Sequence, residues 1–153
     1  MLTYRTPVLR EWIDYNEHLR DAFYFLIFSY ATDVLMARIG LDAAGRADTG
    51  HTLFTLEAHI NYLAQAKLHE ALEVRTSFID RDLKRLHIVH NLYREGTAEP
   101  LAVSEQMLMN IDSRTGRSSA FAGAVDARIS ELFRQFQGAR HPGYCGKTIG
   151  IRR

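Results

Sequence analysis

The residues with the clearest chemical potential lie in a short polar segment, residues 12–21, directly before a long apolar run. Asp14 is a carboxylate that could attack a carbonyl carbon or activate a water molecule. Seven residues later, Asp21 stands where a helix would begin, and the first amides of a helix lack carbonyl partners and attract oxyanions. The spacing fits a carboxylate acting beside an oxyanion hole. The alternative is a polar turn closed by Asp14 and Asn16 and capped by Asp21.

A long helix must follow this segment. Apolar residues continue from about Asp21 to Ile39 and cover far more than one face, which predicts a helix buried on most sides. Gly40 is a good C-terminal stop. Residues 3–11, before the polar segment, are typical of a short strand. The candidate catalytic segment is therefore expected to connect a strand to the start of a buried helix.

After the helix, the period of the apolar pattern changes from 3.6 to 2. Residues 53–63 have apolar side chains at even positions, and three further alternating segments follow at 72–78, 86–92 and 101–111. A second helix is expected from about Val125 to Phe136, before a basic tail at residues 139–153. The order predicts a single domain spanning residues 1–153, with an α+β fold in which an antiparallel sheet of about five strands surrounds the long helix.

Two polar residues interrupt apolar strand faces. His90 and Glu105 are equidistant from the centre of the turn marked by Gly96 and Pro100, so antiparallel pairing would place them opposite each other. A buried carboxylate needs a partner, and we therefore expect a structural His90–Glu105 interaction, the alternative being a pair that orients the site. His87 lies three residues from His90 and would point to the other face, which disfavours a shared metal. No metal site is expected.

Composition narrows the class of protein. The 153 residues carry 19 basic and 18 acidic side chains, a net charge of +1, which argues against nucleic acid as the main partner. Residues 132–153 contain five basic and no acidic side chains, so the first 131 residues carry a net negative charge. Cys145 is alone, which excludes an internal disulfide and a cysteine-based zinc site. The apolar run at 22–37 is short and interrupted, and the N-terminus is unlike a signal peptide, so we expect a cytoplasmic protein without a membrane partner.

The polar segment resembles a known signature. Asp14, Asn16, His18 and Tyr24 match the pattern D-x-N-G-H-[MV]-x-x-x-x-Y of hotdog-fold thioesterases related to 4-hydroxybenzoyl-CoA thioesterase, and the expected elements match that fold over nearly the whole chain. Glu17 departs from the pattern, where the family has Gly or another small residue. Further segments resemble the subgroup associated with, or fused to, L-carnitine dehydrogenase, which acts on betainyl-CoA: Trp-Ile-Asp-Tyr-Asn at 12–16, Glu-Ala-His-Ile at 57–60, residues 82–87, residues 104–108 and the C-terminal residues 146–151.

The resemblance implies a hotdog fold and the hydrolysis of an acyl-CoA thioester, in this subgroup betainyl-CoA to betaine in carnitine degradation. Asp14 would be the nucleophile or general base, and backbone N–H groups near Asp21 would form the oxyanion hole. Asn16 and His18 would shape the loop, while Glu17 either keeps an ordinary backbone conformation or adds a second carboxylate. CoA enters as part of the substrate, with no other cofactor. A homodimer or homotetramer with the site between protomers is also implied.

A quaternary ammonium group binds aromatic faces and carboxylates. The candidate substrate-binding residues are Trp12, Tyr15, Tyr24, Tyr62 and Glu57. A core role is the alternative for the aromatic residues, and a solvated sheet position is the alternative for Glu57. The acidic body of the chain would also attract a cationic acyl group over long range.

CoA phosphates require basic residues at the mouth of a cleft. Lys84, Arg85 and Arg114 are the candidates, and each could instead be a plain surface charge. The basic tail could serve CoA phosphates or a neighbouring protomer. Alternatives to a betainyl-CoA thioesterase are a general short- or medium-chain or aromatic acyl-CoA thioesterase, a hotdog hydratase, and a non-catalytic acyl-CoA-binding module.

Overall fold

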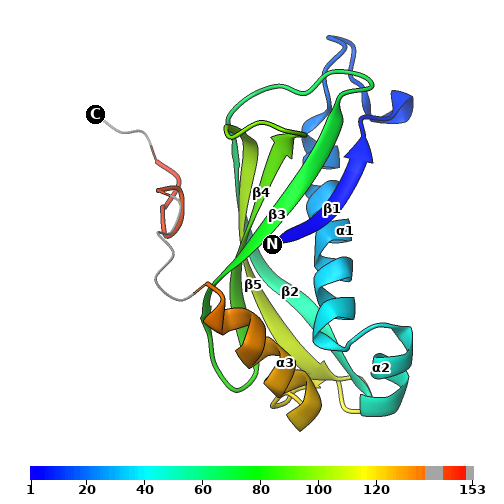
Figure 1. Ribbon diagram of the computed structural model, residues 1–153, viewed down its shortest axis with the longest axis vertical. Coiled ribbons are helices and arrows are strands. Elements are labelled where there is room, and N and C mark those ends of the chain that lie inside the picture. The colour runs from blue at the N-terminus through cyan, green and yellow to red at the C-terminus, as the bar shows by residue number, and fades with distance from the viewer. Residues whose placement is uncertain (137–142, 151–153) are drawn as a thin grey trace.

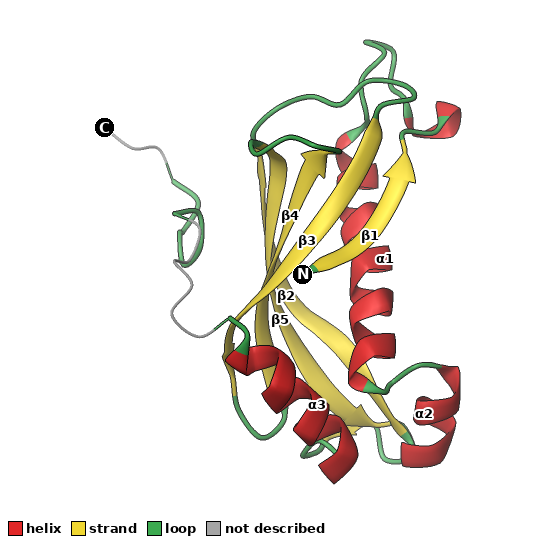
Figure 2. Cartoon of the chain, viewed as in Figure 1, coloured by secondary structure: helices red, strands yellow, loops and turns green. Residues whose placement is uncertain are grey.

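A curled antiparallel sheet packs along one side of a long helix (Figures 1 and 2). The computed structural model describes residues 1–136 and 143–150. The strands lie in the order β1-β3-β4-β5-β2, and the short β6 pairs with β5. The elements are β1 (Leu2–Pro7), a 3-10 helix η1 (Arg10–Trp12), α1 (Asp21–Ile39), α2 (Ala43–Thr49), β2 (His51–Tyr62), β3 (Ala71–Arg81), β4 (Arg85–Arg94), β5 (Pro100–Asp112), β6 (Arg117–Ser118) and α3 (Gly123–Arg134). The expected α+β hotdog architecture is confirmed.

Helix α1 has the bounds that the sequence predicts, Asp21–Ile39. Gly40 ends it in the left-handed conformation with φ of 88°, and a β-carbon at this position would also collide with the Arg128 side chain. By length and composition alone α1 could cross a membrane. Eight of its residues are nevertheless buried against the rest of the chain, as in the core helix of a folded domain. Phe25 and Tyr30 are 40% and 37% exposed, so the expected burial on most sides is wrong for the single chain.

The core forms two clusters along α1. The first surrounds the start of the helix and joins Tyr24 and Phe28 to Val8 and Trp12 from the N-terminal segment. The second surrounds the end of the helix, where Leu35 packs with side chains from the sheet and α3. A 19-residue helix is about 28 Å long at 1.5 Å per residue, so the two clusters mark opposite ends of the molecule.

The expected His90–Glu105 interaction is wrong. Pairing near the β4–β5 turn places Tyr93 opposite Pro100 but Leu92 opposite Ala102, which makes Leu101 an extra, bulged residue. The Tyr93–Pro100 pair centres the turn one residue earlier than expected. The extra residue then sets His90 opposite Ser104, so the His90 and Glu105 side chains point to opposite faces of the sheet. His90 is fully buried against α1, whereas Glu105 lies on the face turned away from the helix and binds His87.

Strand β2 is an edge of the sheet with an unusual surface. Its alternation predicts an apolar face, yet Phe54, Leu56 and Tyr62 are 55%, 54% and 52% exposed. The pairing with β5 also shifts between Thr55 and Glu57. An edge strand presents unpaired backbone groups. Here it presents large apolar side chains as well.

Two elements differ from the sequence expectation. Strand β1 ends at Pro7, and η1 occupies part of the segment expected to continue it. Helix α2 has no counterpart in the expected order, because its seven residues, Ala43–Thr49, contain no apolar stripe and none of them is buried. Asp42 caps this helix by accepting a hydrogen bond from the amide of Gly45 at 2.8 Å.

Candidate active site

The polar segment before α1 folds into a tight hairpin. The amide of Asp14 donates to the carbonyl oxygen of His18 at 2.9 Å, and Ile13 pairs with Leu19 as an isolated β-bridge. At the tip, Glu17 has a φ of 62°, in the left-handed region that favours glycine. An ordinary backbone conformation at Glu17 is therefore wrong, and the loop keeps the strained conformation although its residue has a side chain.

The Asp14 carboxylate is fixed by the hairpin that it belongs to. Its Oδ1 accepts hydrogen bonds from the amides of Asn16 at 2.8 Å and His18 at 3.1 Å. The side chain is only partly exposed, and no ion pair involves it among the described residues. One oxygen thus holds the loop, while the other is not needed for it. The turn and the catalytic interpretations of Asp14 are therefore compatible.

Helix α1 begins directly after this hairpin. Asp21 is its first residue, and Arg20 occupies the N-cap position without a side-chain cap. The amide of Arg20 donates to the carbonyl of Trp12 at 2.9 Å, which keeps the start of the helix beside the hairpin. As a first-turn residue, Asp21 has an amide with no intrahelical carbonyl partner, and its carboxylate accepts from the amide of Ala22 at 2.8 Å. A first-turn amide without a carbonyl partner therefore lies next to the segment that carries Asp14, as the oxyanion-hole prediction requires.

Tyr24 and Tyr62 meet at the same end of α1. Their rings pack edge to face with centroids 5.3 Å apart, and the Tyr62 hydroxyl donates to the carbonyl oxygen of Asp21 at 3.3 Å. The buried Tyr24 hydroxyl donates to the carbonyl of Ala64 and accepts from the amide of Ala66, both at 3.1 Å. Burial raises the pKa of both tyrosines. Tyr24 anchors the chain after β2, and the half-exposed Tyr62 offers a ring face beside the helix start.

The other two aromatic candidates lie elsewhere. Trp12 is 6% exposed and stacks on Phe23 with ring centroids 5.8 Å apart, so its ring belongs to the core. Tyr15 is 92% exposed at the hairpin tip. The structure therefore brings Tyr24 and Tyr62 together with the hairpin, but it does not assemble an aromatic cage that includes Trp12 in the described chain.

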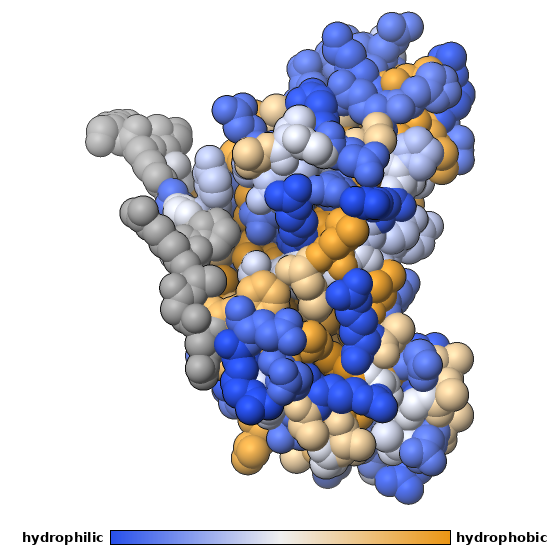
Figure 3. All heavy atoms as spheres, in the orientation of Figure 1, coloured by the Kyte–Doolittle hydropathy of each residue, from blue (hydrophilic) through white to orange (hydrophobic). Residues whose placement is uncertain are grey.

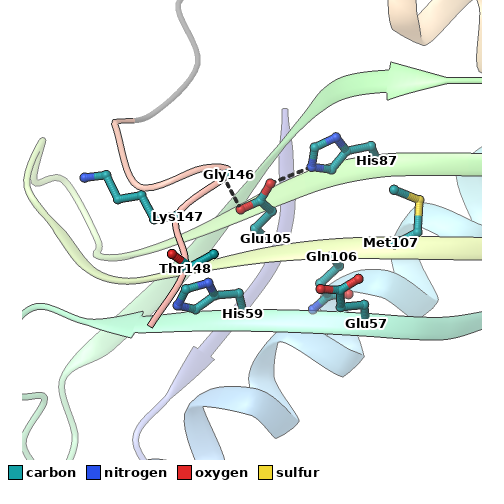
Figure 4. A pocket seen from close by; sticks show the side chains of 9 residues that line it. All are labelled: Glu57, His59, His87, Glu105, Gln106, Met107, Gly146, Lys147 and Thr148. Carbon is teal, nitrogen blue, oxygen red and sulfur yellow. Dashed lines mark hydrogen bonds and ion pairs between the residues drawn. The ribbon is translucent and has the colours of Figure 1, made fainter. Parts of the chain in front are cut away.

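Glu57 lies in a separate pocket of about 300 Å³ on the face of the sheet turned away from α1 (Figure 4). Glu105 is fixed there by hydrogen bonds from His87 Nε2 at 2.7 Å and from the amide of Gly146 at 2.8 Å. The C-terminal segment 143–150 thus folds back onto the sheet. Sequence reasoning missed the His87–Glu105 pair because the bulge at Leu101 gave no signal.

The three candidate CoA-binding residues lie at the opposite end of the folded molecule from Asp14. The carbonyl of Leu83, in the turn before β4, accepts from the amide of Phe121, just before α3 (Figure 1). Lys84 reaches Ser118 at 3.2 Å, Arg85 binds Asp82 and Arg114 binds Asp112. The first two also lower the pKa of Asp82 to about 2, chiefly through the Lys84 amide and then the Arg85 side chain.

Within residues 1–136 and 143–150, no group of three or more His, Cys, Asp or Glu side chains is placed to hold a metal ion. His87 and His90 point to opposite faces, as their spacing predicts. Of the basic tail, Arg140, Arg152 and Arg153 lie outside the described residues, while the Lys147 ammonium lies 5.2 Å from the centre of the Tyr144 ring.

Comparison with known proteins identifies the family of the chain. Residues 8–129 match the family model of the thioesterase-like superfamily. The chain is 51% identical to a betainyl-CoA thioesterase of Pseudomonas aeruginosa, over 99% of this chain and 95% of the relative. It is 30% identical to an L-carnitine dehydrogenase/betainyl-CoA thioesterase of Rhizobium meliloti, over 97% of this chain, and spans 30% of that longer protein.

A solved structure shares the fold closely. A Staphylococcus aureus protein, determined in complex with CoA, is 32% identical and superposes with a TM-score of 0.92, over 99% of this chain and 96% of that chain. The match covers the hairpin, α1 and the sheet alike. This chain therefore belongs to the thioesterase-like superfamily and is a thioester hydrolase with the hotdog fold.

Proposed function

We propose that this protein hydrolyses betainyl-CoA to betaine and CoA, as a step of carnitine degradation. The observation that carries the proposal is the hairpin that fixes the Asp14 carboxylate just before the start of α1, in a chain 51% identical to a protein named for this activity. The reaction needs a nucleophile, water and a site for the oxyanion, and it requires no cofactor other than the CoA that the substrate carries. A cytoplasmic location, where CoA esters are metabolised, is part of the proposal.

Asp14 can act in two ways, as a nucleophile or as a general base. Its carboxylate attacks the thioester carbonyl, the CoA thiolate leaves, and water then hydrolyses the mixed anhydride; alternatively, it takes a proton from the water that attacks the carbonyl directly. In either route, amides in the first turn of α1, beginning with Asp21, stabilise the oxyanion. Asn16 and His18 hold the Asp14 carboxylate through their own amides.

The cationic acyl group needs an aromatic face or a carboxylate near the reacting carbon. Tyr62 is the best placed of the candidates, because its ring is half exposed and its hydroxyl touches the first residue of α1. Tyr24 supports that ring from behind, and Tyr15 is free to approach from the hairpin tip. Glu57 and Trp12 would serve less directly, Trp12 by fixing the hairpin from the core.

A second copy of the chain would complete the site. The exposed apolar edge of β2 is the surface for it, and a two-fold axis would pair two such edges in antiparallel fashion. Antiparallel pairing brings opposite ends of the two protomers together, so the Lys84, Arg85 and Arg114 end of one protomer would approach the hairpin of the other. The distance between these residues and Asp14 within one chain then has a functional reason.

The β2 edge gives a direct test of assembly. Replacing Phe54 and Leu56 by Lys together should weaken the dimer at least about tenfold, because each loses apolar contact and adds repulsion across the axis. Leu2→Lys, on the other edge strand β1, is the control and should keep the wild-type state. Light scattering after gel filtration measures both. A wild-type protein that is monomeric at micromolar concentration would contradict the proposal.

Substrate class is tested with a panel of thioesters. Betainyl-CoA, acetyl-CoA, octanoyl-CoA and benzoyl-CoA are compared by thiol release under identical conditions. We expect betainyl-CoA to have the highest kcat/KM, by roughly tenfold or more. A preference for octanoyl-CoA or benzoyl-CoA would favour the general or aromatic thioesterase, and binding without thiol release from any member would favour the non-catalytic module.

A further inference from the structure

A pocket of about 310 Å³ lies against the hairpin that carries Asp14. It is formed where three segments meet: η1, the hairpin, and the connection between β2 and β3. The surface at this end of the molecule is mostly hydrophilic (Figure 3). The lining residues are Arg10, Ile13, Asn16, Glu17, His18, Lys67 and Leu68.

Two basic residues from different elements line this pocket. Arg10 belongs to η1 and Lys67 to the β2–β3 connection, and both residues are exposed. Among the residues that the structure describes, neither the Arg10 guanidinium nor the Lys67 ammonium has a carboxylate within 4 Å. By contrast, Arg85 and Arg114 are already bound to acidic side chains. Two basic side chains without acidic partners at one pocket favour the binding of an anion there.

The pocket is tied to the candidate catalytic hairpin by backbone pairing. His18 and Lys67 form an isolated β-bridge, and the amide of Leu19 donates to the carbonyl of Ala66 at 2.8 Å. Asp14 in turn pairs with His18. Since paired strands lie about 4.8 Å apart, the backbone of Lys67 is about two strand spacings from that of Asp14. The backbone that carries Lys67 is therefore fixed relative to the hairpin that carries the Asp14 carboxylate.

We propose that Arg10 and Lys67 bind a phosphate group of the CoA moiety. This inference rests on the proposed function, because CoA is the anionic part of the substrate and the betainyl group is cationic. The flexible pantetheine arm separates the phosphates from the thioester, so a phosphate in this pocket can leave the thioester at the hairpin. The acidic Glu17 also lines the pocket, so two basic side chains there face one carboxylate.

The first test measures the affinity of CoA itself by calorimetry. Arg10→Gln and Lys67→Gln should each weaken CoA binding by about 3- to 10-fold at low salt, as expected for a charge-assisted contact at a partly exposed site. Their affinities should also depend less on salt than that of the wild type. Glu17→Gln should bind CoA more tightly, since it removes a repulsive charge. Arg134→Gln, on α3, is the matched control and should bind CoA as the wild type does.

A second ligand, dephospho-CoA, shows which phosphate of CoA occupies the pocket, because it lacks the 3′-phosphate. If Lys67→Gln weakens the binding of dephospho-CoA as much as that of CoA, the pocket holds the diphosphate. If the effect disappears with dephospho-CoA, it holds the 3′-phosphate. Either result supports the proposal. Both substitutions change exposed side chains, so the variants should fold, and thermal melting checks that they do.

The outcomes also separate this inference from the proposed function. Wild-type affinity for CoA in both Arg10→Gln and Lys67→Gln overturns the phosphate site while thiol release by the wild type still supports the thioesterase. A wild-type protein that neither binds CoA nor releases thiol overturns both. Weakened CoA binding in the two variants, together with thiol release from betainyl-CoA by the wild-type protein, supports both the phosphate site and the thioesterase.

Discussion

Replacing Asp14 by Asn is expected to reduce kcat for thioester hydrolysis by at least about 100-fold, the usual lower range for losing a general base. The substitution removes the charge and the basicity of the side chain. It keeps an oxygen at the position that accepts from the amides of Asn16 and His18, so the hairpin should remain folded. CoA should still bind, because the proposed phosphate contacts do not involve Asp14. Thiol release at saturating substrate measures the change.

A matched variant shows whether the effect belongs to the position or to the charge. Asp33→Asn neutralises an exposed carboxylate on α1, away from the hairpin, and should retain wild-type kcat. Loss of thiol release in Asp14→Asn with normal melting and normal CoA affinity supports catalysis by Asp14. Hydrolysis at the wild-type rate in Asp14→Asn would rule out Asp14 both as the nucleophile and as the general base.

The unfolding free energy is expected to fall by about 2 kcal/mol as the pH is lowered from about 6.5 to about 4.5, through His90 alone. Burial lowers the pKa of His90 to about 3, whereas an unfolded histidine has a pKa near 6.5. Between these values the unfolded chain takes up the proton and the folded one does not. Stability is therefore complete above about pH 6.5 and declines by up to about 1.4 kcal/mol per pH unit below it.

The surroundings explain why His90 stays neutral. Its Nε2 lies 3.0 Å from the Thr32 hydroxyl and its Nδ1 lies 2.7 Å from the Thr76 hydroxyl, while the ring stacks on Phe28. The Thr32 hydroxyl donates to the carbonyl of Phe28, so it accepts from Nε2, and Nδ1 accepts from Thr76. Both ring nitrogens are satisfied by neutral partners. A protonated ring would place two donors in a buried site with no counter-charge.

Urea denaturation at about pH 4.5, 5.5 and 6.5 tests this, because ordinary carboxylates titrate mainly below that range. His90→Gln should flatten the pH dependence while lowering stability at neutral pH, and Thr76→Val, which keeps the histidine, should retain the slope. Equal slopes in the wild type and His90→Gln would show that His90 does not control acid stability.

The sequence predicts most of the scaffold and the place of the chemistry. Helix α1, the four long strands and the Gly96–Pro100 turn follow from local periodicity and from breaker residues, and these signals act over a few residues. The hairpin with Asp14 is indicated by its motif and its place before α1. The bulge at Leu101 carries no such signal, because it depends on how two whole strands pair. One shifted residue is enough to replace the expected partner of Glu105.

The groups around the hairpin are harder to predict, because they come from distant parts of the chain. Lys67 reaches the pocket only through its bridge to His18, and Arg10 only because η1 replaces the end of an expected strand. Neither residue belongs to a recognisable motif. Tyr62 is a candidate by its residue type alone, and its contact with Asp21 depends on the curl of the sheet around α1.

The most direct test of a site built for a cationic acyl group compares betainyl-CoA with 3,3-dimethylbutanoyl-CoA, a neutral analogue of closely similar shape. The two thioesters differ chiefly by the charge of the quaternary centre, so the ratio of their kcat/KM values isolates that charge. Recognition of the cation by an aromatic face and by nearby carboxylates predicts a ratio of roughly ten or more in favour of betainyl-CoA. Equal values, or faster hydrolysis of the neutral ester, would contradict recognition of the cationic centre.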